Sequence, residues 1–232
     1  MHDPYVAKAF EYLLGLGFLV LFAGFWRYAT GGANVSTVPA RVAVKPPARL
    51  PLLDMFRIPE GVLVHPGHSW ARPIGAHAPG VVAVGLDDFA QQLVGPLAAV
   101  DLPQVGTTIE QGMPGWHLRV DSKSIPMISP VTGRVLEINE AALSDTSAVN
   151  KDPYGRGWLL KVESPRLSTN SKQLLAGRAA RDLMTSSWDD LSTMLSPSVG
   201  TVMHDGGAPL NGFARALDEE NWDAIARRFL LT

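Results

Sequence analysis

Three histidines in the first third of the chain have a spacing that could hold a metal ion. His65 and His68 are three residues apart, and His77 follows as a possible third ligand. A catalytic zinc site takes three such protein ligands. A structural role is the alternative, because His65 precedes the turn dipeptide Pro66-Gly67 and no cluster of Asp or Glu accompanies the histidines. On this balance we predict no metal site.

Two adjacent carboxylates, Asp87 and Asp88, have the residue type needed for acid–base catalysis. They stand directly before a short helical apolar pattern with Phe89 and Leu93, so helix capping explains them better. The chain of 232 residues has no cysteine, which excludes thiol nucleophiles, Cys-ligated zinc and disulfides. It also has no glycine-rich phosphate loop, nucleophile elbow or zinc-protease motif. We therefore expect a protein that is not an enzyme.

Short alternating apolar runs, separated by Gly and Pro, predict small antiparallel sheets through the middle of the chain. Trp116, Leu118 and Val120 alternate with polar residues, so one face of this strand should be buried. A polar turn at residues 121–124 and a return strand at 125–128 follow. Any small barrel would give the same alternation, so the pattern leaves the exact fold open.

Four segments carry a resemblance to a known family. They are His68-Ser69-Trp70, VGLDDFAQQLVGPLAAVDLPQVG at residues 84–106, SPVTGRVLEINEAALSD at 129–145 and VNKDPYGRGWLLKV at 149–162. Together they resemble the H protein of the glycine cleavage system over about residues 60–180. The resemblance implies a mainly β, lipoyl-type hybrid barrel-sandwich with short helices. It also implies lipoate as a cofactor, attached to a lysine at the tip of a hairpin.

The lysine that the family modifies is replaced in this chain. In the family it lies ten residues after the glycine matching Gly112 and eight before the proline matching Pro130, and both counts lead to Ser122. A lysine, Lys123, stands one residue later. Because successive side chains project in different directions, a shift of one residue moves the amine away from where a lipoylating enzyme would meet it.

The neighbours of this position also differ from the family pattern. Arg119 stands where the family has a glutamate, and Pro126 where it has an aspartate. We therefore expect no bound cofactor, with lipoylation of Lys123 as the alternative.

An apolar segment at residues 12–26 has no charged residue and predicts an N-terminal membrane anchor. A cleavable signal peptide is the alternative, but Asp3 precedes the segment and Trp26-Arg27-Tyr28 ends it. Basic residues are more frequent after the segment than before it, so the soluble part should face the cytoplasm. The residues expected to contact lipid are Tyr12, Leu13, Leu14, Phe18, Leu19, Val20, Leu21, Phe22, Phe25 and Trp26.

The chain should therefore have four parts. These are the anchor at residues 1–30, a Pro-rich tether at 31–60, the lipoyl-type domain at 61–184 and a helical C-terminal extension at 185–232. We expect helices at residues 171–184, 188–194 and 219–230. The last places Trp222, Ile225 and Phe229 on one face, which could bind a partner or pack on its own domain.

Two functions follow from this reading. The first is a non-catalytic, single-pass membrane subunit that uses a degenerate H-like scaffold to organise a membrane complex, with other subunits and the bilayer as its partners. The second is a membrane-tethered lipoyl carrier with Lys123 modified, serving a glycine-cleavage-type or another lipoate-dependent system. Nucleic acid is not expected as a partner, because the formal net charge is −2.

Overall fold

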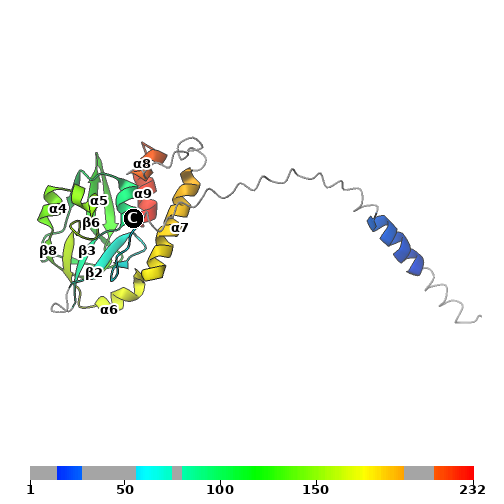
Figure 1. The fold of residues 1–232 in the computed structure, drawn as a ribbon, viewed down its shortest axis with the longest axis horizontal. Helices are drawn as coiled ribbons and strands as arrows, with labels where there is room; N and C mark the ends of the chain where they lie inside the picture. Colours follow the sequence, from blue (N-terminus) through cyan, green and yellow to red (C-terminus); the bar gives the residue numbers. More distant parts are fainter. Residues whose placement is uncertain (1–14, 28–55, 75–79, 196–211) are drawn as a thin grey trace, which may run out of the picture. The chain divides into compact units, whose positions relative to one another are not determined.

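The computed structural model describes residues 15–27, 56–74, 80–195 and 212–232 (Figure 1). The chain divides into two compact units, Met1–Leu50 and Pro51–Thr232. In the first unit, residues 15–27 form an α-helix with exposed side chains. Among the described residues, none of the helices combines the length and apolar character that a membrane crossing requires. The predicted transmembrane helix is therefore not supported, and Tyr12, Leu13 and Leu14 lie outside the described residues, as does most of the predicted tether.

The described strands of the second unit form two antiparallel sheets, which confirms the prediction of a mainly β fold with short helices. The larger sheet has the order β10 (Leu175–Ala176), β1 (Leu63–Val64), β2 (Ser69–Pro73), β3 (Val81–Leu86), β9 (Leu160–Glu163), β8 (Gly133–Ile138) and β5 (Thr108–Ile109). The smaller sheet has the order β4 (Ala99–Asp101), β6 (Pro114–Val120) and β7 (Lys123–Ile128).

The hairpin β6–β7 has the alternation that its sequence predicts. Trp116, Leu118 and Val120 are buried, while the residues between them are exposed. A two-residue turn, Asp121-Ser122, joins the strands, because Val120 already pairs with Lys123. Asp121 has a φ of 52°, a positive value of the kind that two-residue hairpin turns need and that aspartate tolerates. Because β7 begins at residue 123 rather than at the predicted 125, the lysine belongs to the strand.

The core lies between the sheets and the helices that cover them. Trp70 and Trp116 are among the largest fully buried side chains. Gly85 lies against the indole ring of Trp70, where an added Cβ would come within 2.9 Å of the ring carbons. Only a residue without a side chain lets β3 approach this ring so closely.

The described helices of the second unit are α3 (Asp88–Val94), α4 (Glu140–Ser144), α5 (Ser147–Lys151), α6 (Leu167–Asn170), α7 (Gly177–Leu195), α8 (Phe213–Leu217) and α9 (Trp222–Leu230), with a 3-10 turn at Ser171–Gln173. In Figure 1, α7, α8 and α9 lie on one side of the strands and α4 on the other. The prediction of separate helices at 171–184 and 188–194 was wrong. The 3-10 turn and β10 occupy most of residues 171–176, and one helix, α7, then runs from Gly177 through both remaining segments, because no Gly or Pro interrupts it after its first residue.

Candidate functional site

Ser122 lies at the exposed second position of the hairpin turn, at the apex that we define as residues 121–124. This is the position at which the family resemblance implies a modified lysine. A serine hydroxyl has no amine, so it cannot form the amide bond that attaches lipoate. The sequence register therefore places no attachment group at the tip of the turn.

The Lys123 amine is held by the C-terminal helix α9 and by the turn that precedes it. Its Nζ donates hydrogen bonds to the carbonyl oxygen of Glu220 and to Oδ1 of Asp223, and it lies 5.6 Å from the centre of the Trp222 ring. The hydrogen bond from Lys123, together with its charge, lowers the pKa of Asp223 below the ordinary aspartate value. An acylating reagent would have to compete with these two contacts for the nitrogen.

Two arginines add further links between the apex and the helix pair α8–α9. Arg215 of α8 forms an ion pair of 2.6 Å with Asp121 and lies 5.5 Å from the centre of the Trp222 ring. Arg227 of α9 donates a hydrogen bond of 2.6 Å to the carbonyl oxygen of Ser124. The apex therefore contacts residues that lie about a hundred positions later in the chain.

The three residues that the sequence offered for partner binding lie against the chain's own domain. Trp222 is 3% exposed, and Phe229 is buried with its ring 5.6 Å from that of Phe89 in α3. Ile225 is half-buried against the same core. Of the two arrangements left open by the sequence, the structure shows the intramolecular one. Binding of a separate partner by these residues stays a prediction.

A buried polar network joins His68 to two distant elements. Nδ1 of His68 lies 2.8 Å from Oδ2 of Asp87, and Nε2 lies 2.9 Å from Oγ of Ser187 in α7. The other carboxylate oxygen of Asp87 accepts a hydrogen bond from the backbone N–H of Ala90, so Asp87 is the N-cap of α3. The predicted capping role is confirmed. Ser187 was not predicted from the sequence, since nothing in its neighbourhood indicates a hydroxyl that bonds to a side chain 119 residues earlier.

Ser187, His68 and Asp87 have the connectivity of a catalytic triad, but they are placed as a structural network. The exposed fractions are 7% for Ser187, 1% for His68 and 0% for Asp87. With so little of these side chains exposed, a substrate carbonyl carbon has little access to the serine oxygen. A nucleophile needs such access in addition to a base. The network therefore fixes α7 and α3 to the strand that begins at Ser69.

The histidines do not gather around a common point in the described structure. Nδ1 of His65 accepts a hydrogen bond of 3.0 Å from the backbone N–H of Gly67, as expected for a residue that begins a turn. Burial and the nearby His68 lower the pKa of His65. No group of three potential ligands that could hold a metal ion occurs among the described residues, and His77 lies outside them.

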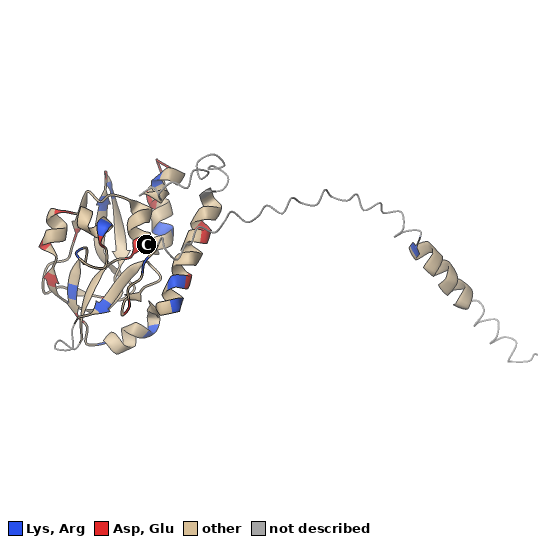
Figure 2. Cartoon of the chain, in the orientation of Figure 1, with Lys and Arg blue, Asp and Glu red and all other residues tan. Residues whose placement is uncertain are grey.

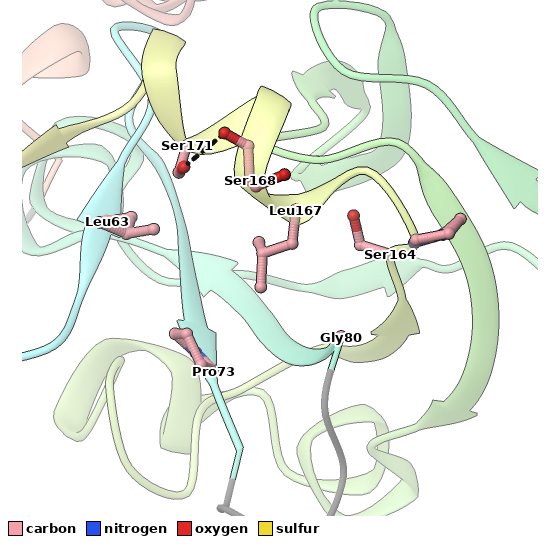
Figure 3. A pocket seen from close by; sticks show the side chains of 8 residues that line it. Leu63, Pro73, Gly80, Ser164, Leu167, Ser168 and Ser171 are labelled. Carbon is pink, nitrogen blue, oxygen red and sulfur yellow. Dashed lines mark hydrogen bonds between the residues drawn. The ribbon is translucent and has the colours of Figure 1, made fainter.

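A cavity of about 550 Å³ opens between strands β1, β2 and β3 and the start of α6 (Figure 3). Its lining combines aliphatic and proline side chains with serine hydroxyls, from Leu63, Pro73, Gly80, Ser164, Pro165, Leu167, Ser168 and Ser171. Among the described lining residues, none has an ionisable side chain. In the view of Figure 2, basic and acidic residues are mixed over the described domain.

Comparison with known proteins identifies the family. The model of the glycine cleavage H-protein family matches residues 65–187, which is more than half of the chain. The chain belongs to the glycine cleavage H-protein family. The family's segment includes the hairpin, the His68 network and most of α7, and it ends before α8 and α9. The family membership that the sequence motifs predicted is therefore confirmed.

Relatives with the name glycine cleavage system H protein occur in several organisms. The one from Rubrobacter xylanophilus is 36% identical over 129 residues, which are 56% of this chain and 97% of the relative. The one from Bacteroides thetaiotaomicron is 37% identical over 112 residues, covering 48% of this chain and 85% of the relative. A crystal structure of an H protein from Mycobacterium marinum is 33% identical, covers 47% of this chain and 87% of that one, and gives a TM-score of 0.43.

These relatives agree better with the carrier interpretation of the sequence than with the membrane-subunit interpretation, because they share the lipoyl-type scaffold and their names refer to glycine cleavage. The apex nevertheless does not fit the cofactor that the family implies. Ser122 offers no amine, and the amine of Lys123 is bound by α9. The scaffold therefore favours a lipoyl carrier, whereas the residues at the attachment position favour a protein without lipoate.

Proposed function

We propose that the protein is an H-type docking module that carries no lipoyl group and has no catalytic chemistry of its own. The observation that carries this proposal is the state of the apex, where Ser122 occupies the family's lysine position and α9 holds the neighbouring amine. In lipoyl carriers the cofactor supplies the reactivity and the protein supplies its placement. A scaffold with no attached cofactor retains its surfaces for binding other proteins.

A lipoyl carrier modified at Lys123 is the second candidate. The family assignment and the 97% coverage of a named H protein favour it. This function requires the amine to leave Asp223 and the carbonyl oxygen of Glu220 before an acyl group can be attached. As a carrier, the lipoyl-bearing Lys123 would serve a glycine-cleavage-type or other lipoate-dependent system.

The mass of the intact protein distinguishes the two candidates. The full chain is expressed with lipoate and a lipoylating enzyme, beside an ordinary H protein as the positive control. We expect the control to gain a lipoyl-sized increment and the wild-type chain to keep its unmodified mass. The variant Ser122→Lys, which restores an amine at an exposed turn position, tests whether the family position still functions as an acceptor.

A lipoyl-sized increment in the wild-type chain that disappears in Lys123→Arg would overturn the first candidate and establish the second. Arginine keeps the positive charge beside Asp223 but cannot be lipoylated. Loss of the increment would therefore not be a consequence of a misfolded apex.

A further inference from the structure

The contacts between the apex and the helix pair α8–α9 form a matched set of charges. Asp121 meets Arg215, Lys123 meets Asp223, and the carbonyl oxygen of Ser124 meets Arg227. The apex thus presents an acid, a base and an acceptor in turn, and the helices present the complement of each. Such a sequence of pairs specifies one register of the helices on the hairpin.

Trp222 joins two of these pairs. Its buried ring lies 5.6 Å from Nζ of Lys123 and 5.5 Å from the guanidinium carbon of Arg215, so both cations lie over the indole. An indole face attracts a cation through its quadrupole. The ring therefore attracts the same nitrogen that Asp223 and the carbonyl oxygen of Glu220 bind.

Apolar contacts fix the other side of the helix pair. The ring of Phe229 packs 5.6 Å from that of Phe89, and Phe213 packs 5.3 Å from Trp188 in α7. The backbone N–H of Gly212 donates a hydrogen bond of 2.7 Å to the carbonyl oxygen of Gln92. The helices that meet the apex are therefore anchored in the core of the domain.

We propose that α8 and α9 form an intramolecular clasp that withholds the Lys123 amine from acylation, with Asp223 as the residue that holds the amine. The proposal rests on the proposed function, in which this lysine carries no lipoyl group. The clasp gives a physical reason why the lysine is not lipoylated. The family's matched segment ends at residue 187, so the clasp is built from residues that follow the H-protein segment of this chain. In this proposal the C-terminal extension covers the Lys123 amine, which the H-type fold without the extension would expose.

Lys161 provides an internal control for this proposal. Its side chain is 32% exposed, against 31% for Lys123, and it pairs with Glu137 at 2.7 Å. It also lies 4.7 Å from the centre of the Trp158 ring. These partners, however, come from β8 and from the segment beside β9, and not from α9. A change in the clasp should leave Lys161 as it is.

The experiment measures how fast each lysine of the full-length protein is acetylated by a water-soluble amine-reactive ester, with peptide mass spectrometry as the readout. In the wild type we expect Lys123 to react about tenfold more slowly than the exposed Lys172. Asp223→Asn removes the carboxylate charge and should raise the rate at Lys123 by about fivefold. The rate at Lys161 should stay the same in both proteins.

The variant Asp223→Glu retains the carboxylate and should keep most of the protection, whereas a general loss of folding would raise the rates of Lys123 and Lys161 together. Circular dichroism of each variant checks the fold. A wild-type rate at Lys123 equal to that at Lys172, or a rate unchanged by Asp223→Asn, would overturn the clasp. The mass measurement described above decides lipoylation independently, so the two proposals can fail separately.

Discussion

At the scale of single residues, the chain uses its chemically versatile groups to hold elements together. His68 links Asp87, the N-cap of α3, to Ser187 of α7, and all three side chains are buried. The same residue types in an open cleft would serve catalysis. Their burial shows that the arrangement of donors and acceptors alone does not define an active site.

Replacing His68 with alanine tests this structural role. The change leaves the Asp87 carboxylate buried without its side-chain partner, so the free energy of unfolding should fall by about 3 to 5 kcal/mol. Urea denaturation measures the loss. His117→Ala, at an exposed position of β6, is the control and should change stability by less than about 0.5 kcal/mol. Equal stability of the two variants would contradict the role assigned to the network.

At the scale of elements, the helix pair derives its stability from apolar burial more than from its ion pairs. Partly exposed pairs such as Lys123–Asp223 contribute about 0 to 1 kcal/mol each. A buried aromatic side chain contributes about 1.5 to 3 kcal/mol. The rings of Trp222 and Phe229 therefore hold α9 on the domain, and the charged groups determine where along the hairpin it lies.

Trp222→Ala should detach the helix from the apex. Truncation of a buried aromatic residue costs about 3 to 5 kcal/mol, and the loss should fall mainly on the local opening of α9. Hydrogen exchange of the α9 amides measures this opening. Arg228→Ala changes an exposed residue of the same helix and should leave the exchange rates within a factor of about two.

The pH dependence of the same helix follows from two carboxylates. The hydrogen bond from Lys123 lowers the pKa of Asp223, and backbone N–H donation from Asn221 lowers the pKa of Asp218. A lowered pKa in the folded state adds stability above the unfolded value of about 3.9, and this stability is lost as the pH falls through the folded value. Exchange protection of α9 should therefore be constant above about pH 5 and decline below about pH 4.

In the double variant of Asp218→Asn and Asp223→Asn this decline should be smaller, because both titrating groups have been removed. An unchanged pH profile would show that other carboxylates control the helix.

The sequence predicted the elements with strong local patterns and missed the contacts between distant ones. The alternation of Trp116, Leu118 and Val120 determines which face of β6 is buried, so this strand was predicted correctly. The helical period of α9 was also visible. The surface on which α9 packs could not be predicted, because Asp223 and Lys123 are 100 residues apart and a local period carries no information about such a pair. Figure 1 shows α9 beside the strands.

At the scale of the whole molecule, membrane anchoring by the N-terminal segment stays a prediction from hydropathy. Its uncharged residues 12–26 predict that the full chain sediments with membranes and resists extraction at alkaline pH. A variant that lacks residues 1–28 should remain in the supernatant and keep the fold of the second unit, which has its own core. Release of the full chain by alkaline washing would contradict the anchor.

The separation between Lys123 and Asp223 also has a consequence for newly synthesised chains. The ribosome adds about 5 to 20 residues per second, so the hairpin precedes its covering helix by about 5 to 20 seconds. During that interval the amine has no carboxylate beside it. Any enzyme that modifies this lysine would have its best opportunity on the nascent chain, before α9 has been synthesised.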